Sequence, residues 1–266
     1  MTLAIPPFSG LALVTPGTSK QDIYEASATQ QHMLSTKLDM QDGRVFRYAK
    51  GGAVALVQAL MGQTAVKDSK FVEIVQTGYA QVVGDTDITV LCTTGSAAGE
   101  NDFSGGWLVC NKVSPAVLGD IYGILASKLQ IGADTKLDLK LASPWRNAMG
   151  VTGEISLNYS KFFKTVVNAA YNQTAAVIGV PLCPVPIGYY YWAQVKGPAP
   201  LMVDTSETLE IGDMVACAVT LAVPGACGPW THVTTGDSTY QMSRPWGTAM
   251  SIAAADEPAL IDLCLE

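Results

Sequence analysis

The chain has 266 residues, of which 48% are hydrophobic and only 15% are charged, and its formal net charge is −7. High hydrophobicity with little charge excludes a disordered protein, and the length allows one large or two smaller β domains with a sizeable core. An acidic chain repels phosphate backbones, so no nucleic-acid partner is expected. No apolar run approaches the ~18 residues of a membrane-spanning helix, so no membrane partner is expected either.

Residues 1–20 are rich in proline, glycine, serine and threonine, and we expect them to form an extended arm. Some of its side chains are too apolar for a free tail and predict docking on another protein surface: Ile5, Phe8, Leu11, Leu13 and Val14. The first residues lack a basic segment, and Pro6 and Pro7 interrupt any apolar one. We therefore expect no secretion signal and folding in a cytoplasm.

Asp42-Gly43 is a strong signal for a two-residue hairpin turn, because such turns require positive φ. We place one strand before it, in residues 33–40, and one after it, in residues 44–49. Residues 51–62 stay ambiguous: Val54, Val57 and Met61 have helical spacing, but glycines bracket the segment.

From residue 71 onward, apolar residues alternate with polar ones, which predicts half-buried strands. The alternating apolar positions are Ile88, Val90 and Cys92, then Leu137, Leu139 and Leu141, then Ile155, Leu157 and Tyr159. A strand is also expected after Gly105. One segment differs: apolar residues recur at helical spacing after Ser160, a possible N-cap, and predict a short helix at about 161–171.

The last hundred residues return to strand patterns. The aromatic run 189–192 predicts a strand that the Gly197-Pro198 pair ends, and alternation places Tyr190 and Trp192 on one of its faces. We interpret these two side chains as candidates for an interface with another subunit, because tyrosine and tryptophan are enriched in interfaces. The final strand contains Ile261, Leu263 and Leu265, and we expect it to be paired inside a sheet.

These elements predict an all-β fold of the sandwich or barrel type, with one short helix and the N-terminal arm. The predicted division is an arm at 1–20, a core β domain of 21–80 plus 161–266, and a second β lobe at 81–160.

A search for catalytic and metal-binding patterns yields none. His32 and His232 are the only histidines, and neither accompanies a Gly-x-Ser-x-Gly sequence or a His-Glu-x-x-His helix. The acidic residues of 204–213 do not match a calcium loop. The six cysteines form no Cys-x-x-Cys pair and are interpreted as free thiols. We therefore expect no enzyme activity, no cofactor and no metal.

Several segments, in their order along the chain, resemble the head decoration (cement) proteins of tailed bacteriophages. They are the Pro-rich start, Asp42-Gly-Arg-Val-Phe-Arg-Tyr-Ala49, Gly105-Gly-Trp-Leu-Val109, Pro186–Gln194 with Gly197-Pro198-Ala199, Ile211-Gly-Asp213, and the close at 259–265. The chain departs from that pattern at Ser35, where glycine is expected, and residues 111–180 match least.

The resemblance implies a structural protein that stabilises the outer surface of a phage capsid. Its partners would be the major capsid protein and copies of itself, with a homotrimer favoured by the local threefold positions of a shell. The alternatives are another virion component, such as a tail, neck or fibre-base protein, and a glycan-binding β module.

Overall fold

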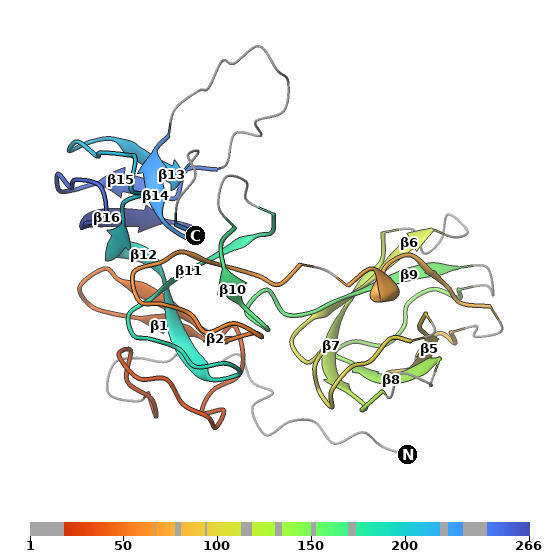
Figure 1. Cartoon of the computed structure of the whole chain (residues 1–266). Coiled ribbons are helices and arrows are strands. Elements are labelled where there is room, and N and C mark those ends of the chain that lie inside the picture. Colours follow the sequence, from red (N-terminus) through yellow and green to blue (C-terminus); the bar gives the residue numbers. More distant parts are fainter. Residues whose placement is uncertain are drawn as a thin grey trace, which may run out of the picture. The chain divides into compact units, whose positions relative to one another are not determined.

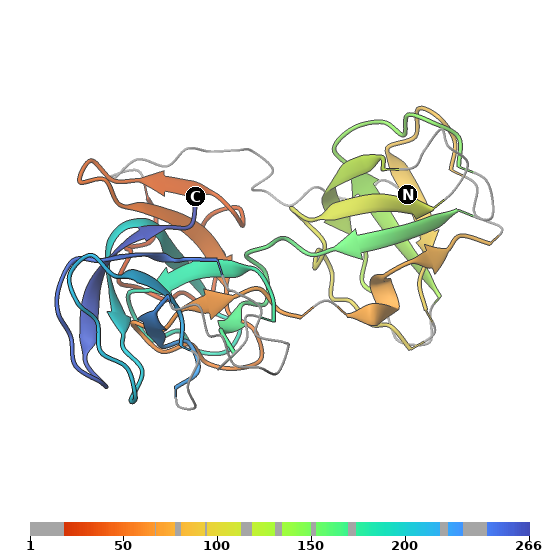
Figure 2. The same cartoon turned by 90° about the horizontal axis from the view of Figure 1, so that it is seen from above.

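The computed structural model describes residues 19–66, 68–77, 81–93, 95–112, 119–130, 135–149, 153–169, 174–218, 223–230 and 244–266. The described chain is almost entirely β-structure, which confirms the predicted all-β class. It forms two compact units: an insert unit, residues 68–160, and a flanking unit, residues 19–66 plus 161–266. Each unit contains one curled sheet (Figures 1 and 2).

The flanking unit holds the larger sheet. Its strands are β1 (Lys37–Asp39), β2 (Val45–Lys50), β3 (Gly62–Gln63), β10 (Val166–Val167), β11 (Val177–Pro181), β12 (Tyr190–Met202), β13 (Met214–Cys217), β14 (Cys227–Pro229), β15 (Gly247–Ala249) and β16 (Pro258–Cys264). They follow the order β10-β3-β11-β12-β16-β15-β13-β14, with β2 paired to both β1 and β12.

The predicted hairpin is confirmed, but its turn is not the expected two-residue one: the Met40 N–H donates to the Arg44 carbonyl at 2.9 Å, so three residues, 41–43, form the loop, and of the predicted pair only Gly43 has positive φ. β1 and β2 pair antiparallel with Leu38 opposite Phe46, and Gly43 in the turn has a φ of 89°. Only glycine adopts this backbone conformation without steric cost, which explains why the Asp-Gly signal was reliable.

Strand β12 continues through Gly197-Pro198, so the predicted break is wrong. The register shifts between Gln194 and Lys196, and Gly197 takes a φ of 80°. Beyond this irregularity Pro198 and Pro200 alternate with residues that face β16, so their missing N–H groups do not interrupt the ladder. The final strand β16 lies between β12 and β15, as expected.

The core of this unit lies on one face of the sheet. It includes Val45, Tyr191, Leu201, Trp246 and Ile261, all less than a tenth exposed. β16 alternates buried and exposed side chains along its length, which is the pattern of a strand with one wet face.

The predicted helix at 161–171 is wrong over its described part. Residues 161–164 form turns with Lys164 at a φ of 54°, and Val166 and Val167 form β10, which pairs with β3. The β-branched run Thr165–Val167 favours extended backbone, and pairing with Gly62 and Gln63 outweighs the helical spacing of the apolar side chains.

The ambiguous segment 51–62 contains no helix either; it consists of turns and isolated bridges that end in β3.

The insert unit contains the second sheet, in the order β4-β9-β6-β7-β8-β5. Its elements are the 3₁₀ turn η1 (Ser69–Phe71), β4 (Ile74–Val75), β5 (Asp87–Leu91), β6 (Trp107–Lys112), β7 (Ile121–Ser127), β8 (Lys136–Leu141) and β9 (Glu154–Asn158). The predicted alternation is confirmed in β5 and β8, whose apolar positions face the core. In β9, Ile155 and Leu157 face the core as predicted, but Ser156 between them is buried as well, so this strand has no wet face at its centre.

The boundary between the units differs from the predicted one. Residues 68–77, which the sequence assigned to the core domain, belong to the insert unit. Ile74 in β4 pairs with Ile155 in β9, and the buried Phe71 packs edge-on against Phe103 with ring centroids 5.0 Å apart. The short apolar pattern at 71–75 gave no hint of its partner strand.

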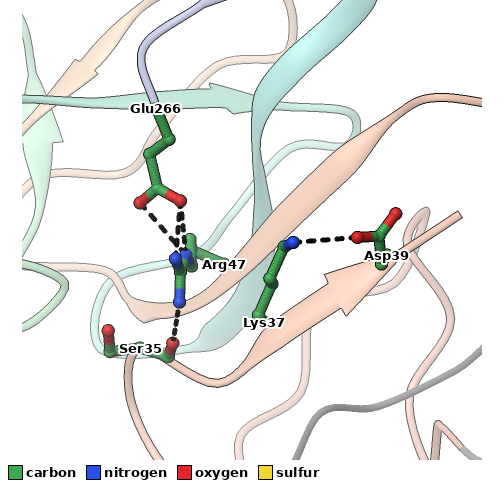
Figure 3. Close-up of polar contacts among 5 residues, drawn as sticks. All are labelled: Ser35, Lys37, Asp39, Arg47 and Glu266. Carbon is green, nitrogen blue, oxygen red and sulfur yellow. Dashed lines mark hydrogen bonds and ion pairs between the residues drawn. The ribbon is translucent and has the colours of Figure 1, made fainter.

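The C-terminal residue is attached to β2 (Figure 3). The Glu266 carboxylate accepts hydrogen bonds from Nε and Nη2 of Arg47 at 2.6–3.0 Å, and Arg47 Nη1 donates to the Ser35 carbonyl at 3.0 Å. Lys37 and Asp39 form a separate ion pair along β1. The bidentate pair fixes the chain end against the hairpin.

Candidate functional site

The first part of β12 carries the aromatic side chains that the sequence proposed for an interface. Tyr190 is half-buried, whereas Tyr191 and Trp192 have no exposed surface. The indole of Trp192 lies 4.9 Å from the Tyr48 ring and 5.2 Å from the His32 ring, measured between centroids. Trp192 is therefore a packing residue of its own unit, which corrects its assignment to an interface.

Trp192 is buried because residues 19–34 cover it, which the sequence patterns did not predict. Residues 19–34 lie over the face of β2 and β12 that carries Tyr48 and Trp192. Gln21 is the main connection: its Oε1 accepts from the Tyr48 hydroxyl at 2.6 Å, and its carbonyl accepts from Trp192 Nε1 at 3.1 Å. Its Nε2 donates to the carbonyls of Glu25 and Tyr190. Buried polar atoms require partners, so Gln21 fixes this covering segment in one position.

Burial raises the pKa of Tyr48 to about 12, so its hydroxyl keeps the proton that it donates to Gln21.

His32 lies beneath the start of the described chain. Its Nε2 accepts from the backbone N–H of Lys20 at 3.2 Å and lies 3.4 Å from Ser19 Oγ. Burial, and secondly the Lys20 charge, lower the pKa of His32 below its usual 6.5. The imidazole is therefore neutral at pH 7, with the proton on Nδ1.

The Ser19–His32 pair does not have the geometry of a nucleophile and its base. The Ser19 hydroxyl donates to the Gln21 carbonyl at 2.5 Å, so its proton points away from His32. The hydrogen bonds of His32 in the described chain serve to hold Ser19 and Lys20 in place. His232 lies outside the described residues.

A groove of about 510 Å³ runs between the covering segment and the hairpin. It is lined by Ser19, Lys20, Gln21, Asp22, Ile23, Tyr24, Leu38, Met40 and Arg44. The Arg44 guanidinium in its wall already forms an ion pair with Asp42, with 2.7 Å between Nη2 and Oδ2. The groove mixes apolar and polar walls and could hold a short peptide or a small polar ligand.

The acidic residues do not assemble into a metal site in the described part of the chain, where no group of three potential ligands occurs. Asp204 is fully buried and accepts hydrogen bonds from the backbone of Ser206 and Val223, so it closes a loop. Asp87 pairs with Lys140 across β5 and β8. All six cysteines are free, and Cys264 is exposed.

Sequence patterns also missed an exposed tryptophan in the insert unit. Trp107 in β6 is 50% exposed and lies over Gly123 of β7, where a Cβ would stand 3.7 Å from the ring. The missing side chain at Gly123 leaves space for the indole beside β7. The Gly-Gly-Trp sequence could have drawn attention to it, since glycine often marks a close approach.

The five arm residues proposed for docking, Ile5, Phe8, Leu11, Leu13 and Val14, lie outside the described residues. Among the described residues no helix is long and apolar enough to cross a bilayer. Comparisons with protein-family models, curated proteins and solved structures found no match.

Proposed function

We propose that the chain is a structural virion protein that decorates and stabilises the outer surface of a phage capsid. The proposal rests on the positions of the motifs that resemble the decoration proteins: several of their glycines have a backbone conformation that favours glycine. Gly43, Gly197 and Gly212 all have positive φ, at 89°, 80° and 95°. The motifs therefore supply the hairpin turn, the irregularity within β12 and the turn before β13 in the flanking unit, and a protein that shares them in this order is expected to share the unit.

The surface supports the same proposal. The flanking unit exposes large apolar side chains, among them Val54, Ile187 and Ile252, each more than half exposed. Exposed apolar patches are typical of proteins that work in assemblies. The polar cluster around Gln21 and His32 is engaged in packing, which supports a structural role over a catalytic one.

The test is a binding assay with isolated phage parts. Purified protein is mixed with expanded capsids that lack it and, in parallel, with tails of the same phage, and each mixture is pelleted. We expect saturable binding to capsids at a fixed number of copies per shell and none to tails. Saturable binding to tails alone would assign the chain to the tail, neck or fibre base and overturn the capsid proposal.

The second candidate function, glycan binding, is favoured by Trp107. A half-exposed indole on the surface of a sheet is a platform on which a sugar ring can stack. A glycan array with the wild-type chain and the Trp107→Ala variant tests it. Binding that disappears in the variant supports a glycan-binding module, and an empty array for the wild type removes that candidate.

A further inference from the structure

Two buried cysteines of the flanking unit lie directly opposite each other in neighbouring strands. Cys217 of β13 is the cross-strand partner of Cys227 of β14. They are 4% and 0% exposed and belong to the same core cluster. Directly opposite residues of two antiparallel strands point to the same face of the sheet, so the two thiols lie side by side in the core. No other two cysteines are opposite each other in the strands that the structure describes.

The hydrogen bonds of the ladder show which kind of pair this is. The Ala218 N–H donates to the Ala226 carbonyl at 3.4 Å, so the pair next to the two cysteines is hydrogen-bonded. Bonded and non-bonded pairs alternate along an antiparallel ladder, which makes Cys217 and Cys227 a non-hydrogen-bonded pair. The Cys227 carbonyl accordingly accepts from the Asp204 N–H at 2.9 Å, outside the β13–β14 ladder.

A pair of this kind meets the requirements of a disulfide. Its Cα atoms stand about 4.5 Å apart, and disulfides join residues whose Cα atoms are about 4.4–6.8 Å apart. The Cys217 Sγ also accepts a hydrogen bond from Asn168 Nδ2 at 3.1 Å. This bond does not use the thiol proton, so it can persist when the proton is lost. Only the weak bond from the thiol to the Ala169 carbonyl, at 3.5 Å, would be given up.

We propose that Cys217 and Cys227 form a disulfide that joins β14 covalently to β13 when the chain is exposed to a disulfide oxidant such as oxidised glutathione. The Cys217 thiolate attacks one sulfur of the oxidant, forms a mixed disulfide and releases one glutathione. The Cys227 thiolate then attacks the Cys217 Sγ, forms the Sγ–Sγ bond and releases the second glutathione. The two thiols are oxidised, the oxidant is reduced, and both thiol protons end on the glutathione sulfurs. This inference goes beyond the proposed function and does not depend on it.

Burial makes the exchange slow. It raises the pKa of both thiols, that of Cys227 to about 12, and only a thiolate attacks a disulfide. The exchange therefore proceeds when β14, a strand of three residues at the end of the strand order, opens locally from β13. Reducing surroundings keep such a pair as thiols and oxidising surroundings keep it as a disulfide, so the state of the bond follows the surroundings of the protein.

The test is a map of the thiols after oxidation of the folded protein. The parent chain carries Cys264→Ser, because this exposed thiol could join two copies. It is incubated with excess oxidised glutathione until its free-thiol content no longer changes. The remaining thiols are then alkylated, and the digested peptides are identified by mass spectrometry.

We expect Cys217 joined to Cys227 in most chains, Cys110 alkylated, and both thiols restored by dithiothreitol. The proposal is overturned by Cys217 and Cys227 that are both still alkylated, by either of them bound to glutathione as the end product, or by a bond to a different cysteine.

Urea denaturation then measures whether the bond stabilises the fold. It closes a loop with nine residues between the cysteines and so removes entropy from the unfolded chain. Oxidation is expected to raise the folding equilibrium constant at least about tenfold. Cys110→Ala, at a comparably buried cysteine outside the pair, is the matched control and should respond to oxidation like the parent, whereas Cys227→Ala should not respond.

Should Cys227→Ala fail to fold, the parent before and after reduction gives the same comparison. An oxidised parent with a midpoint at or below that of the reduced parent would show that the bond does not stabilise the pairing of β14 with β13, and would overturn this part of the proposal.

Discussion

At the scale of single residues, Ser35 shows where this chain departs from a favourable backbone choice. Its φ is 70°, in the left-handed region, and the family resemblance leads us to expect glycine here. A residue other than glycine costs roughly 1–2 kcal/mol in that region, and glycine would remove this cost. Glycine also increases the conformational entropy of the unfolded chain, which offsets part of that stabilisation. We expect Ser35→Gly to raise the free energy of unfolding by about 0.5–1 kcal/mol.

Urea denaturation measures this change as a higher midpoint with an unchanged slope. Ser35→Ala, which keeps the left-handed cost and removes only the hydroxyl, is the control. A lower midpoint for the glycine variant would show that the serine side chain contributes more than its backbone conformation costs.

Because His32 holds the covering segment in place, we expect the stability of the folded chain to depend on the protonation of its imidazole. Its pKa is lowered in the folded state by burial and by Lys20, so the unfolded chain binds its proton first as the pH falls. Stability from His32 is therefore complete above about pH 6.5 and is lost as the pH falls from there through the lower folded pKa. Among the described residues, the groups in contact with the ring are Ser19, the backbone N–H of Lys20 and the rings of Tyr48 and Trp192, and none of them is a carboxylate that would reverse this sign.

We expect the wild type to lose stability between about pH 6.5 and pH 5, and His32→Gln to lose less over that range. Urea midpoints at each pH measure the difference. His232→Gln is the control for the second histidine. Parallel profiles for the wild type and His32→Gln would contradict the assignment to His32.

At the scale of elements, Gly247 determines how closely β15 lies on β16. A Cβ at this position would stand 2.1 Å from the Asp262 carbonyl oxygen and 3.0 Å from the Leu263 Cα, and neither backbone atom can rotate away. Gly247→Ala is expected to lower the free energy of unfolding by about 1–3 kcal/mol, the usual cost of overpacking.

The comparison is Gly123→Ala in β7, where the nearest atom to a Cβ is the Ala142 Cβ at 3.4 Å. Both variants are measured by urea denaturation, and Gly123→Ala should stay within about 0.5 kcal/mol of the wild type, as most unstrained substitutions do. An equal loss in the two variants would mean that close approach to β16 is not the cause.

The strands that could be predicted from the sequence are those in which apolar and polar residues alternate. Ile88, Leu139 and Leu157 alternate with polar neighbours, and a period of two has a single structural reading. Val166 and Val167 could not be placed, because their apolar spacing also fits a helix and their partner Gly62 is about a hundred residues away. Long-range pairing leaves no local sign, so β10 was predicted as helix.

The same limit applies to the candidate site. Tyr190 and Trp192 were correctly placed in a strand, but their exposure depended on Gln21, which lies 171 residues before Trp192. An isolated glutamine in a loop carries no periodic signal.

At the scale of the whole molecule, both ends of the described chain are attached to the same strand. Near the first described residues, Gln21 accepts a hydrogen bond from Tyr48 of β2, and the last residue, Glu266, binds Arg47 of that strand. Ser19 and Lys20 are held by His32. These bonds hold the covering segment through residues from Ser19 onward, so removing the residues before Ser19 is expected to leave the flanking unit folded.

This separation makes the N-terminal arm testable apart from folding. Residues 2–18 contain Ile5, Phe8, Leu11, Leu13 and Val14, and we expect them to dock on a capsid or a neighbouring copy. Full burial of one such side chain contributes about 1.5–3 kcal/mol, and 1.4 kcal/mol is a tenfold change in affinity. Deletion of residues 2–18 should therefore weaken binding to expanded capsids at least about tenfold, measured by pelleting across a concentration series.

A chain with the arm replaced by a Gly-Ser sequence of equal length separates the loss of apolar side chains from the loss of length. If the deleted protein melts like the wild type and binds capsids with the same affinity, the arm has no docking role.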